Sequence, residues 1–527
     1  MLGYNSRRTS FSSIGAATNG GLVVPGVYAL SNSVAAPAAP GESEYQIGVD
    51  GMFGQASFGY KNFLYVDLTA RQDVSSTLPV ANNTYLYPSA TLSLIFSELV
   101  DIDGLDFGKV RLNYASVGSD APAQALVDAY GIGTPFNGVT LASAPSTQNN
   151  GGLLPENTVS TEAGVELKFL KNRAGLDLSV YNSSTYNQIL PAQVSSATGT
   201  YFKYVNAGQI DNSGVELSAY FTPVKTSDFQ WDVNVNWSRN RNNVVELFGD
   251  SQTLLLASVQ GGINITARVG QPYGTLEGTT FVRDAASNAP IVYEWTSSWR
   301  GGHRYLRGDV GPVGNIQADW RGGLNNSFSY KNITVSALID AQMGGNFFSL
   351  DAWYGYATGV YDFQAGTNAN GHTIRDYVEN GGGMTWGDVQ TSNPQIETPV
   401  LWDGASLDAD GNPVVSGSPD ASLMMYMNGY GNTLGYALAP NELHVYDASF
   451  VKLREVAVTY QVPSSKLGDL PVAGVDVSLV GRNLAILYKN TPYSDPEAGL
   501  SAGNVQGYQS GAYPTLREVG LNLRVKF

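Results

Sequence analysis

The stretch that most constrains the fold is the closing one, TLREVGLNLRVKF, which begins at Thr515. Every second residue from position 519 onward is apolar: Val519, Leu521, Leu523, Val525 and Phe527. Because successive side chains of a strand point to opposite faces, this stretch predicts a strand with one apolar and one polar face. In a soluble protein the apolar face would pack on a core, whereas in an outer-membrane barrel it would face lipid. We interpret the five apolar residues as the C-terminal signal strand of an outer-membrane protein.

The same alternation recurs along the chain, which favours the barrel over the soluble interpretation. It is clearest in a predicted hairpin, whose strands at 165–169 and 176–180 flank the tight turn KNR. Short turns and long loops alternate between the predicted strands, as they do in outer-membrane barrels. Roughly fourteen candidate strands are present, mostly about ten residues long, the length that a tilted strand needs to cross a bilayer. The alternation slips near Glu455, which predicts a β-bulge or a change of register.

Composition excludes several kinds of function. The chain has 29 basic and 45 acidic residues, a formal net charge of −16, which argues against a nucleic-acid partner. It has no cysteine, so disulfides, thiolate metal sites and cysteine nucleophiles are excluded. Its three histidines are far apart in the sequence, and it contains no Ser-His-Asp grouping or phosphate-binding loop. We therefore predict no catalytic residues, no metal and no cofactor, and a protein that is not an enzyme.

The hydropathy of the sequence excludes a membrane-spanning helix. No run reaches the roughly 18 apolar residues that such a helix needs. The first residues, MLGYNSRRTSFSSIG, lack the apolar core and the small-residue cleavage site of a signal peptide. Since only helices and closed barrels satisfy their backbone in lipid, a membrane protein with this sequence must be a barrel. The predicted fold class is all-β, an antiparallel transmembrane β-barrel with long extracellular loops.

Several segments resemble the C-terminal part of SusC/RagA-type TonB-dependent outer-membrane transporters. In family order they are YLYPSATLSLIFSE, KVRLNYASVGSD, EAGVELKFLKNRAGLDLSVYN, NAGQIDNSGVELSAYFTPV, WDVNVNWSRNRNNVVEL, GQPYGTLEG, FVKLREVAVTYQVPSSKL, VSLVGRNLAILYKNTPYSDPE and VGLNLRVKF. The order runs from about Tyr45 to the end of the sequence. The resemblance implies a barrel of about twenty-two strands with an N-terminal plug, capped by a SusD-type surface lipoprotein and driven by TonB.

The resemblance also indicates which parts of the family pattern are missing. Nothing in this sequence resembles the plug or the segment that contacts TonB, and about eight of the expected strands are absent upstream of Tyr45. We therefore expect residues 1–44 to be a partial strand and loop at a truncated start. Residues 45–527 would be the C-terminal part of the receptor barrel, in a shortened sequence or in one piece of a split protein. The implied partners are outer-membrane lipid, the lipoprotein, and TonB through a plug outside this chain.

Aromatic residues in the long loops are the candidate substrate-binding residues. They are Trp295, Trp299, Trp353, Tyr354, Trp386 and Trp402. Their rings could stack on sugar rings or on side chains of a bound peptide, because aromatic residues offer a large contact area at low entropic cost. The alternative is that they pack the loops against one another or meet the lipoprotein. The acidic run DADGNP, from Asp408 to Pro413, departs from the pattern of a calcium loop and predicts a hairpin turn.

Together these features predict energy-coupled uptake of an oligomeric nutrient, a glycan or a peptide, across the outer membrane of a Gram-negative bacterium. Two other functions fit the same strands. A passive porin would share the alternation but would have no plug. A β-rich surface adhesin or binding protein would also be rich in turns, and it would stay soluble without detergent. The closing strand and the ordered family segments favour the transporter.

Overall fold

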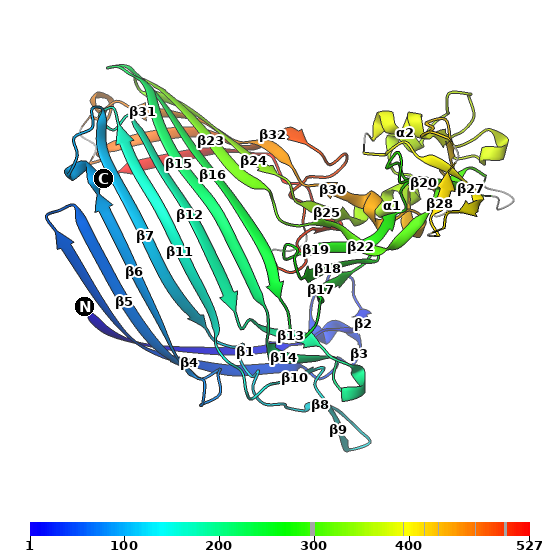
Figure 1. Cartoon of the computed structure of the whole chain (residues 1–527), viewed down its shortest axis with the longest axis horizontal. Coiled ribbons are helices and arrows are strands. Elements are labelled where there is room, and N and C mark those ends of the chain that lie inside the picture. The colour runs from blue at the N-terminus through cyan, green and yellow to red at the C-terminus, as the bar shows by residue number, and fades with distance from the viewer. Residues whose placement is uncertain are drawn as a thin grey trace. The chain divides into compact units, whose positions relative to one another are not determined.

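The computed structural model of the protein describes residues 1–295, 301–393, 395–409, 411–415, 417–429, 432–468, 471–499 and 503–527. Its main element is an antiparallel sheet of 14 strands, called the wall sheet below (Figure 1). In sheet order the strands are β1 (Leu2–Gly15), β4 (Gly41–Tyr60), β5 (Leu64–Ser75), β6 (Thr84–Ile95), β7 (Leu105–Ser119), β11 (Glu156–Phe169), β12 (Ala174–Tyr186), β15 (Gln209–Lys225), β16 (Phe229–Glu246), β23 (Trp320–Tyr330), β24 (Ile333–Met343), β31 (Phe450–Val462), β32 (Gly474–Lys489) and β34 (Glu518–Lys526). The predicted all-β antiparallel fold class is confirmed.

The chain divides into two compact units, which are described separately. Unit 1 comprises Met1–Phe169, Leu178–Ser213 and Val244–Leu254. Unit 2 comprises Leu170–Asp177, Gly214–Asn243 and Leu255–Phe527.

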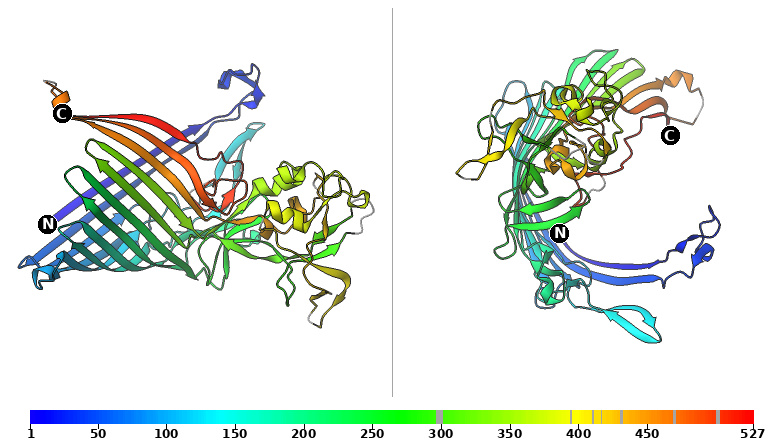
Figure 2. Two further views of the ribbon diagram at one scale, coloured as in Figure 1. Left: turned by 90° about the horizontal axis from the view of Figure 1, so that it is seen from above. Right: turned by 90° about the vertical axis from the view of Figure 1, so that its right-hand side faces the viewer.

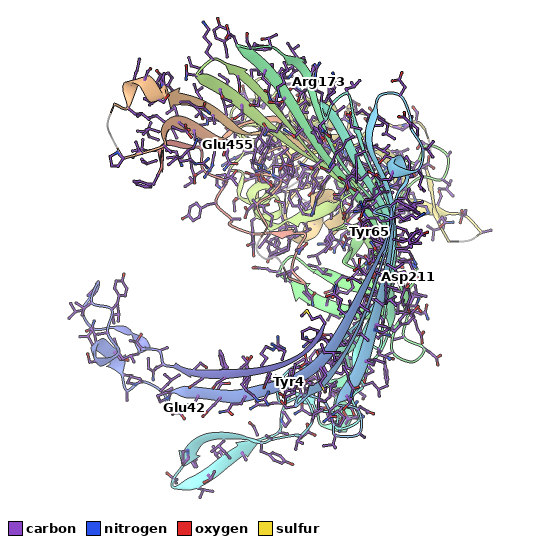
Figure 3. All side chains as sticks on the ribbon, turned by 90° about the vertical axis from the view of Figure 1, so that its left-hand side faces the viewer. Tyr4, Glu42, Tyr65, Arg173, Asp211 and Glu455 are labelled. Atoms are coloured by element: carbon purple, nitrogen blue, oxygen red, sulfur yellow. The ribbon has the colours of Figure 1, made fainter. Side chains whose placement is uncertain are left out.

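In unit 1, apolar and polar side chains form separate rows across neighbouring wall strands, and Figure 3 shows side chains on both faces of the ribbon around Tyr65. One row contains Phe58, Val66, Leu92, Leu112 and Ala163. The adjacent row contains Ser57, Asp67, Thr91, Asn113 and Glu162. Because directly opposed residues share a face, one face of this part of the sheet is apolar and the other is polar. Phe58 and Leu112 are 61% and 50% exposed, so the described chain leaves the apolar row uncovered.

Unit 2 repeats this arrangement across six wall strands. The apolar row contains Trp231, Phe328, Val335, Val458, Leu479 and Leu521. The adjacent polar row contains Gln230, Ser329, Thr334, Thr459, Ser478 and Asn522. Figure 2 shows the last strands of this set, in orange and red, side by side. Leu521 is 76% exposed, so the closing strand β34 has the uncovered apolar face that its sequence predicted.

The connections between wall strands leave alternate edges of the sheet and differ in length, as predicted. At one edge they are 61–63, 96–104, 170–173, 226–228, 331–332 and 463–473, none of them longer than eleven residues. At the other edge they are the short connection 76–83 and the long connections 16–40, 120–155, 187–208, 247–319, 344–449 and 490–517. In an antiparallel sheet every second connection leaves the same edge, so the long connections share one edge of the strands.

The long connections of unit 2 fold into small sheets of their own. One has the order β17 (Thr253–Val259), β18 (Ile263–Arg268), β19 (Thr275–Phe281) and β22 (Arg307–Asn315). A second, called the loop sheet below, has the order β26 (Met384–Thr385), β29 (Met424–Met425), β21 (His303–Tyr305), β20 (Ile291–Glu294), β27 (Val400–Leu407) and β28 (Pro413–Val415). A third has the order β30 (Val445–Asp447), β25 (Asn346–Ser349) and β33 (Tyr508–Gln509). Strand β19 lies in a long connection and not in the wall sheet.

The long connections of unit 1 form smaller pieces. These are the pair β2 (Asn19–Leu22) and β3 (Ser33–Ala35), the pair β8 (Gly131–Phe136) and β9 (Val139–Ser143), and the sheet β10 (Thr147–Gln148), β14 (Phe202–Asn206) and β13 (Ile189–Gln193).

The described residues of the long connection 344–449 include two short α-helices. Helix α1 (Leu350–Thr358) begins where the side chain of Ser349 accepts a hydrogen bond from the backbone of Ala352. Helix α2 (Trp386–Ser392) begins with a capping box formed by Thr385 and Asp388. No helix in the described part of the chain has the length and apolar character needed to cross a bilayer.

Candidate functional site

A β-bulge interrupts β31 at Arg454, where the sequence predicted a slip of register. Toward both β24 and β32, the register passes from Leu453 to Glu455 without an opposite residue for Arg454. An extra residue of this kind bends a strand and re-aims its side chain. Arg454 and the nearby Lys452 reach the connection that follows β32.

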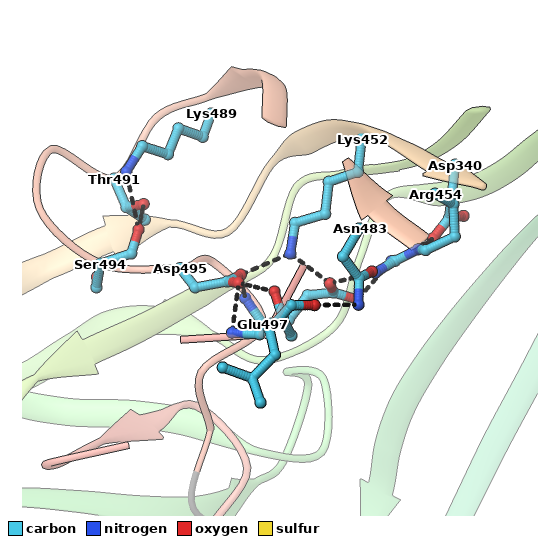
Figure 4. Close-up of polar contacts among 11 residues, drawn as sticks. Asp340, Lys452, Arg454, Asn483, Lys489, Thr491, Ser494, Asp495 and Glu497 are labelled. Atoms are coloured by element: carbon cyan, nitrogen blue, oxygen red, sulfur yellow. Dashed lines mark hydrogen bonds and ion pairs between the residues drawn. The ribbon is translucent and has the colours of Figure 1, made fainter. Parts of the chain in front are cut away.

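Lys452 and Arg454 hold the start of that connection through an ion-pair cluster (Figure 4). The Nζ atom of Lys452 donates hydrogen bonds to Asp495 Oδ1 at 2.6 Å and to Glu497 Oε2 at 2.5 Å. Arg454 donates from both terminal nitrogens to the two carboxylate oxygens of Glu497, at 2.8 and 2.7 Å, and it also pairs with Asp340 on β24. The side chains of Lys452 and Asp495 are only 2% and 4% exposed. The cluster therefore fastens a long loop to the wall sheet through buried, charge-assisted hydrogen bonds.

The cluster favours the ionised form of both loop carboxyl groups. Burial opposes ionisation of Asp495, but hydrogen bonds from Lys452, from Thr515 and from the backbone of Glu497 outweigh it and lower its pKa to about 2. Burial also opposes ionisation of Glu497, yet hydrogen bonds from Arg454 and Lys452 lower its pKa. Because a buried charge is costly without its partner, each cation is needed to keep the loop in place.

These residues were not among the candidates chosen from the sequence. Both partners nevertheless lie in segments that resemble the family, FVKLREVAV for the strand and NTPYSDPE for the loop. The sequence did contain a signal for the cluster. Lys452 and Arg454 are two basic residues close to the predicted register slip at Glu455. The slip itself was recognised, but the loop partner was not, because Lys452 and Asp495 are 43 residues apart in the sequence.

Two of the six candidate aromatic residues lie in hydrophobic cores of the loops, each in a different one. Trp386, at the start of α2, is fully buried and donates from Nε1 to the hydroxyl of Tyr305 at 3.2 Å. Trp353, in α1, is 7% exposed, and its ring centroid lies 4.5 Å from that of Tyr436. Rings in such positions bury large apolar areas and stabilise the fold. For these two residues the structure favours the packing alternative over ligand contact.

Tyr354 and Trp295 are half-buried and are contacted on one side by polar groups. The hydroxyl of Tyr354 accepts a hydrogen bond from Gln260 Nε2 at 2.6 Å. The guanidinium of Arg304 lies over the ring of Trp295, which also meets Tyr426 edge-on at 6.3 Å between centroids. These contacts fix the orientation of both rings.

Trp402 is the remaining described candidate. It lies on β27, is half-buried, and donates from Nε1 to the backbone oxygen of Ser406 at 2.9 Å. Trp299 lies outside the described residues. As substrate contacts, all six aromatic residues stay predictions.

The described residues of the run DADGNP, 408–409 and 411–413, form the predicted turn. Strands β27 and β28 pair antiparallel on either side of it, with Leu407 opposite Pro413. The carboxylate of Asp408 accepts from the backbone nitrogen of Asn412 at 2.7 Å, as in a side-chain-stabilised turn. In the described ranges, no three His, Asp or Glu side chains are grouped as metal ligands would be.

The family of the chain follows from a comparison with family profiles. The profile described as "TonB dependent receptor-like, beta-barrel" matches residues 2–310, which is more than half of the sequence. The chain belongs to this family. Its location is the outer membrane of a Gram-negative bacterium, as predicted.

The match to this chain covers only part of the length of each named relative. TonB-dependent receptor P26 of Formosa agariphila is 25% identical over 501 residues, which cover 90% of this chain and 46% of that protein. TonB-dependent receptor SusC of Bacteroides thetaiotaomicron is 26% identical over 208 residues, which cover 37% of this chain and 21% of that protein. The chain thus spans about half the length of the curated relatives that match most of it.

Solved structures share the fold of the receptor. The RagAB peptide importer in its closed-closed state matches with a TM-score of 0.72 and 16% identity, over 100% of this chain and 53% of that chain. The RagAB peptide transporter matches with a TM-score of 0.70 and 17% identity, over the same shares of the two chains. At this identity the likeness describes the fold and carries no statement about substrate.

Proposed function

We propose that the receptor containing this chain imports an oligomeric nutrient, a glycan or a peptide, with energy supplied through TonB. The observation that carries the proposal is the pair of register rows in the wall sheet. An uncovered apolar row suits lipid, and the adjacent polar row suits a water-filled lumen through which a polar oligomer passes. The long connections at one edge of the strands would meet the substrate before it enters that lumen.

A SusD-type surface lipoprotein is the proposed lid over these connections. Two long loops of unit 1 support this partner, because residues 16–40 and 129–155 contain no charged side chain. They expose large apolar residues, among them Tyr28 at 90% and Ile132 at 73%. Exposed apolar groups without nearby charges are typical of a protein contact surface. The named relative SusC adds the family context in which such a lid is expected.

Uptake measured in cells tests the import function. The full-length receptor is produced with its lipoprotein in an outer membrane that lacks other oligosaccharide receptors, and entry of a radiolabelled oligosaccharide mixture is followed. We expect accumulation that stops when an uncoupler collapses the proton-motive force. Entry that persists with the uncoupler would mean a passive porin, and surface binding without entry would mean an adhesin.

Co-purification of the lipoprotein tests the partner. We expect Tyr28→Glu to reduce the amount recovered with the receptor several-fold, because it places a charge in the apolar contact. Lys61→Glu, in a short connection at the other edge of the strands, is the matched control and leaves recovery unchanged. Equal recovery with both variants would contradict the assignment of this loop to the lid.

A further inference from the structure

A cavity of about 420 Å³ opens on the loop sheet, whose strands β20, β27 and β28 are labelled in Figure 1. Its floor is a row of side chains, since Tyr293 on β20 lies opposite both Arg304 on β21 and Trp402 on β27. Opposed residues share a face, and all three line the cavity. The remaining lining residues are Tyr305, Leu306, Arg307 and Leu438. The volume falls in the range that small-ligand sites occupy.

The row lies on the outer face of the loop sheet. The neighbouring row, formed by Val292, Tyr305 and Leu401, packs into or against the main hydrophobic core of the loops. Tyr293, Arg304 and Trp402 are each half-buried, so they retain accessible surface. We call these three residues with Arg307 the Tyr293 platform.

The charge of the Tyr293 platform is opposite to that of the chain. Arg304 and Arg307 line the cavity, and none of the described lining residues is acidic. The whole chain carries a formal charge of −16, so the charged lining of this cavity is opposite in sign to the chain as a whole. Cations at the wall of an apolar cavity favour an anionic group on the ligand.

The groups of the Tyr293 platform are held in position before any ligand arrives. The indole of Trp402 is fixed by its hydrogen bond to the backbone of Ser406, and the guanidinium of Arg304 rests on the ring of Trp295. The hydroxyl of Tyr293 makes no hydrogen bond to another described residue, so it can serve a ligand. A pre-positioned site loses less entropy on binding.

We propose that the Tyr293 platform binds a carboxylated sugar ring of an acidic glycan. The apolar face of the ring stacks on Trp402 and Tyr293, its carboxylate accepts from the guanidinium groups of Arg304 and Arg307, and a ring hydroxyl pairs with the hydroxyl of Tyr293. The inference rests on the proposed import function, because it assigns that function an acidic glycan as its substrate class.

The sheet geometry favours a sugar ring over a peptide. Peptides commonly bind sheets by pairing their backbone with an unpaired edge strand. Strand β20 lies between β21 and β27, and β27 lies between β20 and β28, so both strands carrying aromatic residues of the platform are paired on each side. A ligand on this face can therefore contact side chains but cannot pair with the backbone of these strands. Such a surface suits a sugar ring, which stacks on aromatic side chains.

Binding to the purified full-length receptor in detergent tests the inference without requiring transport. Pentagalacturonate is the anionic probe, and maltopentaose is the neutral control, each followed by titration calorimetry. We expect pentagalacturonate to bind, with affinity that falls as salt is added. Trp402→Ala and Arg304→Gln should each weaken binding by about tenfold or more, since stacking and charge-assisted hydrogen bonds contribute at that level.

Two further variants guard against a folding defect. Tyr293→Phe removes only a hydroxyl and should weaken pentagalacturonate binding several-fold, while Arg321→Gln, on wall strand β23, should leave it unchanged. Equal binding of maltopentaose, or equal affinity in all variants, would overturn the site. Tighter binding of pentaglutamate with the same dependence on Trp402 and Arg304 would overturn the glycan class. If pentagalacturonate does not bind the purified receptor but energy-dependent uptake is still observed in cells, the site is refuted and the import function stands.

Discussion

Replacement of Lys452 by methionine should release the loop that follows β32. Methionine keeps most of the length of the side chain but leaves Asp495 and Glu497 without the cation that meets them at 2.6 and 2.5 Å. Removing one partner from a buried ion pair costs about 3–5 kcal/mol, and a side chain that is 2% exposed qualifies as buried. Because each 1.4 kcal/mol is a factor of ten, the opening equilibrium of the loop should rise about 10²–10³-fold or more. Hydrogen exchange of peptides within 490–499, in the detergent-purified full-length receptor, measures this opening.

The matched control is Arg482→Met. Arg482 pairs with Glu455 at 2.9 Å, but its side chain is 60% exposed, and exposed pairs contribute about 0–1 kcal/mol. Exchange of the loop should therefore change little in this variant. Adding Asp495→Asn to Lys452→Met should restore part of the protection, because it removes a stranded buried charge. If Lys452→Met and Arg482→Met gave equal exchange, the cluster would not be what fastens the loop.

Two further predictions follow from the same unit. The pKa of Asp495 is lowered to about 2. The stability that the ionised carboxylate gives to the folded loop is therefore complete above the ordinary pKa of an aspartate, near 4, and is lost as the pH falls through about 2. Pepsin cleavage within 490–499 should therefore stay slow near pH 4 and accelerate toward pH 2, and a flat rate over this range would contradict the assignment. Trp386→Ala should destabilise the folded loops by about 3–5 kcal/mol, because the indole is fully buried, whereas the half-buried Trp402→Ala should cost less. Thermal unfolding followed by calorimetry compares the two variants. Equal losses of stability would show that the burial of Trp386 does not determine how much it stabilises the loops.

The wall sheet could be predicted because its signal is local. Alternation of apolar and polar residues depends only on neighbours in the sequence, and register follows from it, since a slip of one residue would move every apolar side chain to the wrong face. The slip near Glu455 could be predicted for the same reason. Strand β19, at 275–281, shows the limit of the method. Alternation can mark a stretch as a strand, but β19 pairs with β18 and β22 outside the wall sheet, and the local pattern does not identify the partner of a strand.

The candidate site was harder to predict because it is built by contacts between distant residues. Aromatic residues were chosen from the sequence as exposed ligand contacts, yet Trp386 meets Tyr305, 81 positions away, inside a core. Whether an aromatic ring is buried or exposed depends on packing that periodicity does not describe. Helices α1 and α2 were missed although Ser349 and Thr385 carry capping signals, because a long aromatic stretch without period gave no reason to look for caps.

Cysteine accessibility on β34 tests most directly the claim that the wall sheet faces lipid on one side and water on the other. The 527 residues given contain no cysteine, so each single substitution adds the one thiol of this part of the receptor, and labelling is compared with that of the unsubstituted receptor. Leu521 lies on the apolar row beside Leu479, and Asn522 lies on the polar row beside Ser478. In intact outer membranes containing the full-length receptor, we expect a small water-soluble maleimide to label Asn522→Cys and a lipid-soluble maleimide to label Leu521→Cys. Labelling of both positions by the water-soluble reagent, or the reverse pattern, would contradict the assignment of this sheet as the wall of an outer-membrane receptor.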